Sequence, residues 1–197
     1  MTSAMATRSA TINRRTGETD VRLSLALDGT GAGARHTGVG FLDHMLDLLA
    51  RHGHLDLDLS VSGDLQTGAH HTVEDTAIVL GQALDAALGD RAGIARYGSA
   101  TVPMDEARAT AAVDLVRRPH AEIHLAFAGD RVGGLPLTLL PHALERFAIE
   151  AGCTVHVEAA GEDDHHVAEA AFKALGRALA QACARDGSGP GSTKGSL

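Results

Sequence analysis

Two histidine doublets, each followed by a glutamate, are the residues of this sequence best suited to bind metal ions. One segment, HHTVED, begins at His70, and nearly the same segment, HHVAEA, begins at His165. Residues four apart share a helix face, so His70 with Glu74 and His165 with Glu169 could each bind one ion. The second histidine of each doublet points about 100° away and suits a different ion. Each doublet could therefore serve two metal sites.

Two further histidines repeat at almost the same interval. His44 and His142 are 98 residues apart, and His70 and His165 are 95 residues apart. These histidines, the doublets and their glutamates make eight candidate ligands, enough for two sites of three histidines and one glutamate. A pseudo-twofold relation between the repeats predicts two ligand sets, which are His44, His71, His165 and Glu169 in one site and His142, His166, His70 and Glu74 in the other.

The donor types narrow the choice of metal. Neutral imidazoles with one carboxylate favour manganese, iron or zinc over magnesium or calcium. A single doublet is more often a pair of exposed histidines, but a duplicated set with matching flanking histidines argues against that simpler interpretation. The other six histidines fall on expected loops or strands, where exposure to solvent is the simpler interpretation, and they are His36, His52, His54, His120, His124 and His156.

The segments around these residues alternate between strand and helix patterns. Apolar and polar residues alternate in the expected strands of the first half, which are 10–14, 21–27 and 55–61. Apolar residues recur at helical spacing in 40–52 and 70–88. The second half repeats this order, with expected strands at 94–109 (broken by Pro103), 111–115, 121–126 and 153–158, and expected helices at 141–151 and 164–184.

This repetition predicts an α+β fold made by tandem duplication of a half-domain. Each half is expected to hold a mixed β-sheet with two helices packed on one face. We expect the half-domains at 10–92 and 93–185, a flexible N-terminus at 1–9, and a flexible C-terminal tail with a linker's composition at 186–197.

Composition narrows the class of protein. The 197 residues are 44% hydrophobic and 21% charged, which suits a globular protein with a packed core. A formal net charge of −8 and only 3% aromatic residues oppose nucleic-acid binding. Cys153 and Cys183 form no CxxC pattern, and no apolar run approaches the roughly 18 residues of a membrane span. We therefore expect a soluble cytoplasmic protein without a nucleic-acid or membrane partner.

At the histidine segments the chain closely resembles the imidazoleglycerol-phosphate dehydratases, the manganese enzymes of histidine biosynthesis. The likeness runs from about Ala10 to the last residues. The matching segments stand in the family's order, and they are GFLDHML at 40–46, TGAHHTVED at 67–75, RYG at 96–98, PMDEA at 103–107, HHVAEAAFK at 165–173 and STKG at 192–195.

The resemblance implies a hollow 24-subunit shell whose active sites lie at subunit interfaces and hold two Mn²⁺ ions each, with other divalent metals possible. It implies that Glu18 reaches into a neighbour's site and that Lys173 contacts the substrate. It also implies the positions that hold the substrate phosphate, which are Arg96, Arg118, Ser192 and Lys194.

Some positions depart from the family's pattern. Leu48 stands where many members have a glutamine near the phosphate, and the segment 114–120 has Val-Arg in place of Ser-Gly and histidine in place of tyrosine. Ala143 and Arg146 also differ around His142. No metal ligand is missing, so the departures concern substrate affinity rather than the chemistry.

The reaction implied by the resemblance is removal of water from imidazole glycerol phosphate to give imidazole acetol phosphate. The carbon-bound proton to be removed is barely acidic, so the site must stabilise negative charge, and metal ions can do so as Lewis acids. A deprotonated imidazole ring can then expel the neighbouring hydroxyl. We expect His44 and His71 to act at the catalytic centre and either Glu18 or Glu169 to be the general base, a choice that the sequence leaves open.

Two other functions fit some of these residues. A dinuclear metallohydrolase would also use clustered ions to activate water, and it would not need an imidazole in its substrate. A non-catalytic metal-binding shell protein would take up metal without turnover, and it would have no use for Glu18, Arg96 or Arg118.

Overall fold

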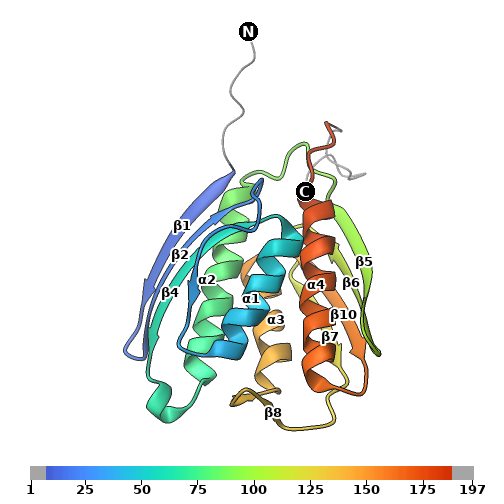
Figure 1. The fold of residues 1–197 in the computed structure, drawn as a ribbon. Helices are drawn as coiled ribbons and strands as arrows, with labels where there is room; N and C mark the ends of the chain where they lie inside the picture. Colours follow the sequence, from blue (N-terminus) through green and yellow to red (C-terminus); the bar gives the residue numbers. More distant parts are fainter. Residues whose placement is uncertain (1–7, 188–197) are drawn as a thin grey trace.

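The computed structural model describes residues 8–187, in which one order of strands and helices occurs twice. Each half contributes a four-stranded sheet. The helices α1 to α4 lie between the two sheets, so each sheet has one face on the helices and one face outward (Figure 1). Among the described residues, no helix is both long and apolar enough to span a membrane.

The first half pairs its strands in the order β1-β2-β4-β3, with only β3 and β4 parallel. A 3-10 turn, η1, precedes its second helix. Its elements are β1 (Ser9–Arg15), β2 (Thr19–Ala26), β3 (Arg35–His36), α1 (Gly40–Gly53), β4 (Asp56–Gly63), η1 (Leu65–Thr67) and α2 (His70–Leu88).

The second half pairs its strands in the equivalent order β5-β6-β10-β7, with only β10 and β7 parallel. A small hairpin, β8 with β9, precedes α3. The elements are β5 (Tyr97–Met104), β6 (Ala107–Asp114), β7 (His120–Leu125), β8 (Arg131–Val132), β9 (Leu135–Pro136), α3 (Leu139–Glu150), β10 (Thr154–Ala160) and α4 (Asp164–Cys183). The expected α+β fold with two mixed sheets is confirmed, and the expected boundary at 92/93 falls between α2 and β5.

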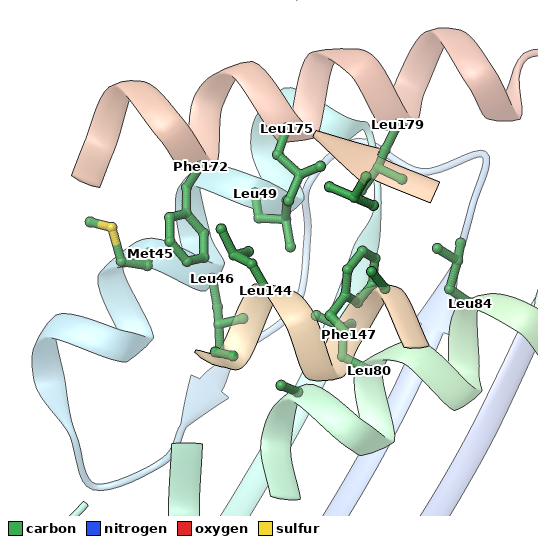
Figure 2. Close-up of a cluster of buried hydrophobic side chains, with 14 of the residues drawn as sticks. Met45, Leu46, Leu49, Leu80, Leu84, Leu144, Phe147, Phe172, Leu175 and Leu179 are labelled. Atoms are coloured by element: carbon green, nitrogen blue, oxygen red, sulfur yellow. The ribbon is translucent and has the colours of Figure 1, made fainter. Parts of the chain in front are cut away.

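Alternation along the strands decides which face of each sheet the helices cover. In β2, Val21, Leu23 and Leu25 are at most 2% exposed, whereas Arg22 and Ser24 between them face outward. Burying the apolar face removes it from water, which is the main favourable term in folding. With few aromatic residues, the core is filled mostly by leucine and alanine. Figure 2 shows leucines of all four helices packed around Phe147 and Phe172.

Two glycines inside helices set how closely the halves approach. A Cβ at Gly176 of α4 would lie 2.8 Å from the Leu49 carbonyl oxygen of α1, and a Cβ at Gly81 of α2 would lie 2.6 Å from the Phe147 carbonyl oxygen of α3. Glycine costs about 1 kcal/mol in a helix interior, so its use here favours close packing over helix propensity. The same close contact therefore joins α1 to α4 and α2 to α3.

The expected strand at 94–109 was wrong in detail. Residues 97–104 and 107–114 form two strands of a hairpin, and Pro103 lies inside β5 instead of ending a strand. Because β5 is the edge strand of its sheet, a residue there can lack the amide hydrogen that a central strand needs. The helix expected from Pro141 begins at Leu139, since proline is tolerated in the first turn of a helix.

Candidate metal centre

The first cluster of possible ligands joins α1 to α4. His44 Nε2 lies 2.7 Å from Glu169 Oε1, and His165 Nε2 lies 3.1 Å from the same oxygen. The side chain of Phe41 packs against the His165 ring, with the ring centroids 5.1 Å apart. The nitrogen and oxygen atoms of the three possible ligands lie within 4.8 Å of one another, so one ion could contact all three.

The second cluster joins α2 to α3 in the equivalent way. Glu74 lies between two imidazoles, with Oε2 3.8 Å from His70 Nε2 and Oε1 3.4 Å from His142 Nε2. The rings of His70 and His142 stack with centroids 5.2 Å apart. Each cluster thus takes a histidine from one half-domain and a His-x-x-x-Glu pair from the other, as the pseudo-twofold relation predicts.

The first cluster strongly favours an ionised glutamate. Glu169 is only 8% exposed, and Lys173 Nζ donates a hydrogen bond of 2.6 Å to its Oε2. Burial raises the pKa of Glu169, but hydrogen bonds from Lys173, His44 and His165 outweigh it and lower this pKa to about 2. Glu169 is therefore a charged ligand at neutral pH and a weak base.

The imidazole nitrogens and carboxylate oxygens of both clusters suit a metal ion. His142 Nε2 is buried and makes no hydrogen bond to any described residue. A buried ring nitrogen without a partner is costly, and coordination to an ion would satisfy it. Two imidazole nitrogens and one carboxylate, with positions left open, suit manganese, iron, cobalt or zinc.

The predicted fourth ligands lie outside both clusters. His71 turns toward Asp64, with its Nδ1 3.0 Å from Oδ2, and its Nε2 lies 3.6 Å from Glu18 Oε1. His166 turns toward Glu106, with its Nδ1 2.8 Å from Oε2. These hydrogen bonds raise the pKa of both histidines. Within one chain, each cluster therefore unites three of the four expected ligands.

The expected phosphate-binding residues that the structure describes lie far from the clusters. Arg96 is 6% exposed and holds Asp114 with two hydrogen bonds, and Arg118 is exposed four residues beyond Asp114. The backbone N–H of Arg96 donates to the Ala182 carbonyl oxygen of α4. At 1.5 Å per helical residue, Ala182 is about 25 Å from His165. Ser192 and Lys194 lie outside the described residues.

Strand β5 gives the same separation independently. Met104 Sδ lies 3.0 Å from Lys173 Nζ, near the first cluster. Arg96 directly precedes Tyr97, the first residue of β5, and Tyr97 is seven strand residues from Met104, which at about 3.3 Å per residue is about 23 Å. The clusters and Arg96 therefore occupy opposite ends of the same chain. In Figure 1 all four helices begin at the cluster end.

A basic pocket lies farther along α1 and α4, toward the C-terminal ends of these helices. Its volume is about 330 Å³, and its lining includes His52, His54 and Arg177. Burial, followed by the charges of Lys173 and Arg177, lowers the pKa of His52. The sequence predicts only solvent exposure for His52 and His54, and Arg177 is not among the predicted site residues. Arg177 follows Lys173 by one helical turn, which is the signal that could have found it.

The fold and the clusters define a duplicated α+β protein with two equivalent candidate metal centres between its halves. A family model described as imidazoleglycerol-phosphate dehydratase matches residues 37–179. The chain belongs to this family, and it is therefore an enzyme, a lyase of histidine biosynthesis. The family assignment sets aside the metallohydrolase and the non-catalytic shell protein.

Individual relatives and structures agree with this assignment. The imidazoleglycerol-phosphate dehydratase of Zymomonas mobilis is 50% identical over 96% of this chain and 99% of its own length. The crystal structure of the enzyme from Staphylococcus aureus superposes with a TM-score of 0.81 at 34% identity, over 89% of this chain and 98% of that one. The crystal structure of the Pyrococcus furiosus enzyme in complex with (S)-C348 superposes with a TM-score of 0.80 at 34% identity, over 94% of this chain and 100% of that one.

Proposed function

We propose that this enzyme removes water from imidazole glycerol phosphate to form imidazole acetol phosphate, at a site that holds two Mn²⁺ ions. The observation that carries the proposal is the repeated cluster of two imidazoles and one glutamate in a chain of this family. Bound divalent ions would supply Lewis-acid stabilisation for the deprotonated ring of the substrate. In the first cluster His44, His165 and Glu169 would hold one ion, and in the second His70, His142 and Glu74 would hold the other.

Each site is completed by a neighbouring subunit. The ring, three-carbon arm and phosphate of the substrate span about 10 Å at ordinary bond lengths. That is less than half of the roughly 25 Å between His165 and Arg96 in one chain. A substrate bound at a cluster can therefore reach only another subunit's Arg96 and Arg118. This need supports assembly into an oligomer, which we propose is the 24-subunit shell that the family resemblance implies.

The outward-facing histidines fit the same assembly. His71 Nε2 and Glu18 Oε1 lie together, and both side chains are partly exposed. If His71 is the fourth ligand of a neighbour's first cluster, Glu18 enters that site beside it. His166 would complete the second cluster of a neighbour in the equivalent way.

Glu18 is the better candidate for the general base. Glu169, with its pKa lowered to about 2, is bound by Lys173 and faces two imidazoles, so it binds a proton poorly at neutral pH. The Glu18 side chain is 55% exposed and can move toward a bound substrate. We infer that Glu18 removes the carbon-bound proton. The hydroxide expelled from the neighbouring carbon and the proton taken up by Glu18 together make the water that leaves, which returns Glu18 to its ionised form.

Turnover by the manganese-loaded protein tests the proposal. We expect imidazole acetol phosphate to form from imidazole glycerol phosphate, detected by the absorbance of the enolised ketone in alkali. His70→Ala and His165→Ala should each abolish turnover and loosen assembly, because each removes a ligand at an interface. His124→Ala is a matched control, since this histidine of β7 is 64% exposed and belongs to neither cluster. Full turnover by either histidine variant would contradict the proposed site.

A further inference from the structure

The second histidine of each doublet is held by a carboxylate on its inner ring nitrogen. Asp64 accepts from His71 Nδ1 through both oxygens, at 3.1 and 3.0 Å, and Glu106 accepts from His166 Nδ1 at 2.8 Å. A carboxylate cannot donate here, so Nδ1 carries a hydrogen, and in the neutral ring Nε2 is then the acceptor. In both cases Nε2 is the nitrogen left to coordinate an ion, although it lies 3.6 Å from Glu18 Oε1 in His71 and 3.8 Å from Asp105 Oδ2 in His166.

The two carboxylates are themselves fixed by other contacts. Asp64 Oδ2 accepts from the Thr67 hydroxyl at 2.9 Å. Glu106 Oε1 accepts from the backbone N–H groups of Glu162 and Asp163, at 3.2 and 2.9 Å, while its Oε2 binds His166. Each carboxylate can therefore set the ring orientation of its histidine.

Duplication alone does not explain this pair of contacts. Asp64 is the first residue after β4, and the first residue after β10 is Gly161, which has no side chain. A Cβ at Gly161 would lie 2.5 Å from Ala107 Cβ, so an aspartate cannot occupy that position. The second half uses Glu106 instead, the residue directly before β6.

The residue of the first half that is equivalent to Glu106 makes a different contact. Glu18 directly precedes β2, as Glu106 precedes β6, but Glu18 faces Nε2 of its histidine and not Nδ1. In both halves a carboxylate therefore accepts from Nδ1, but Asp64 and Glu106 do not occupy equivalent positions in the repeat. Because two different positions of the repeat supply the same contact between a carboxylate and Nδ1, we infer that this contact is required for function.

We propose that Asp64 and Glu106 are positioning residues that fix the tautomer and the ring orientation of His71 and His166 for metal coordination across the subunit interface. The inference rests on the proposed metal sites. A carboxylate on the far nitrogen of a histidine ligand raises its basicity and holds its ring, and loss of such a partner typically weakens metal binding 10- to 100-fold. Neither residue touches the substrate in this proposal.

Metal affinity separates positioning from a purely structural role. We would titrate each full-length variant with Mn²⁺ and follow the free ion by electron paramagnetic resonance. Asp64→Ala and Glu106→Ala should weaken binding at least 10-fold. Asp64→Asn and Glu106→Gln, whose amide oxygens still accept hydrogen bonds, should give a smaller loss. Glu162→Gln, an exposed neighbour of the Glu106 contact, should bind like the wild type.

Ring tautomers provide a readout that needs neither metal nor turnover. In protein labelled with ¹⁵N at histidine, the ring nitrogen shifts of His71 should indicate the Nδ1–H form in the wild type and a mixture in Asp64→Ala. Wild-type Mn²⁺ affinity in Asp64→Ala and Glu106→Ala, or an unchanged His71 tautomer in Asp64→Ala, would overturn the proposal. If Glu106→Ala does not fold, the Mn²⁺ affinity of Glu106→Gln is the test, and it should still be weaker than that of the wild type. The amide oxygen in Glu106→Gln can still accept from the backbone N–H groups of Glu162 and Asp163, so this variant should fold. Wild-type protein that binds Mn²⁺ but does not turn over imidazole glycerol phosphate would contradict the proposed function, and the metal affinities of the variants would still test the positioning role.

Discussion

Lys173 binds the oxygen of Glu169 that the histidines do not use. Its Nζ donates to Oε2, whereas His44 and His165 both face Oε1. An ion could therefore bind at Oε1 without displacing the lysine. The second cluster differs, because Arg146 Nε lies 3.7 Å from Glu74 Oε1, the oxygen that also faces His142. The two clusters have equivalent ligands and one neighbouring cation each, but the cation approaches the carboxylate differently.

Arg146 is expected to weaken the second metal site. Its guanidinium remains charged and shares one carboxylate oxygen with the incoming ion, so the two cations compete. Arg146→Met should tighten binding of the weaker Mn²⁺ equivalent several-fold in a calorimetric titration and leave the stronger one unchanged. Arg146→Lys, which keeps a cation, is the control. Weaker binding by the methionine variant would mean that Arg146 supports the site.

The stability of the metal-free protein should fall in acid because of Glu169. Its pKa is about 2 in the folded protein, below the ordinary 4.5. A lowered carboxylate pKa stabilises the fold above the ordinary value, and that stabilisation is lost as the pH falls from 4.5 toward 2. The contribution is at most about 3 kcal/mol. Urea unfolding between pH 7 and pH 3 should show a flatter pH dependence in Glu169→Gln than in the wild type.

Adding a methyl group between the paired helices should loosen both the core and the clusters. Gly176→Ala brings a Cβ to 2.8 Å from the Leu49 carbonyl oxygen, and backbone atoms cannot easily move away. Overpacking of this kind costs about 1–3 kcal/mol. Denaturant unfolding should show that loss, and Gly81→Ala should behave similarly. Gly40→Ala, where a Cβ meets nothing within 4 Å, should cause no such loss.

Shared active sites predict that two inactive variants can complement each other. Arg96→Ala lacks an expected phosphate ligand, and His165→Ala lacks a metal ligand. When the two chains are unfolded, mixed and assembled together, some interfaces should combine an intact Arg96 from one chain with an intact His165 from the other. The mixture should regain a measurable fraction of wild-type turnover. Complete inactivity, with mixed assembly shown by mass spectrometry, would argue against a shared site.

Much of the fold and part of the site follow from local sequence patterns. The strands and helices of both halves follow from alternating or helical spacing of apolar residues, because a side chain's direction is fixed by its place in the element. The pairing of His165 with Glu169, and of His70 with Glu74, follows from the same rule. The duplication also predicted that His44 would join His165 and that His142 would join His70, as the structure places them.

Other features depend on contacts between segments far apart in the chain. The sequence did not indicate that Asp64 and Glu106 would hold His71 and His166, since the two contacts come from different places in the repeat. Nor did it indicate that Gly81 and Gly176 would let the helices approach. Local spacing fixes which side chains share one helix face. Only the packed chain decides what faces them, because burial, close approach and charge pairing depend on distances that sequence separation does not set.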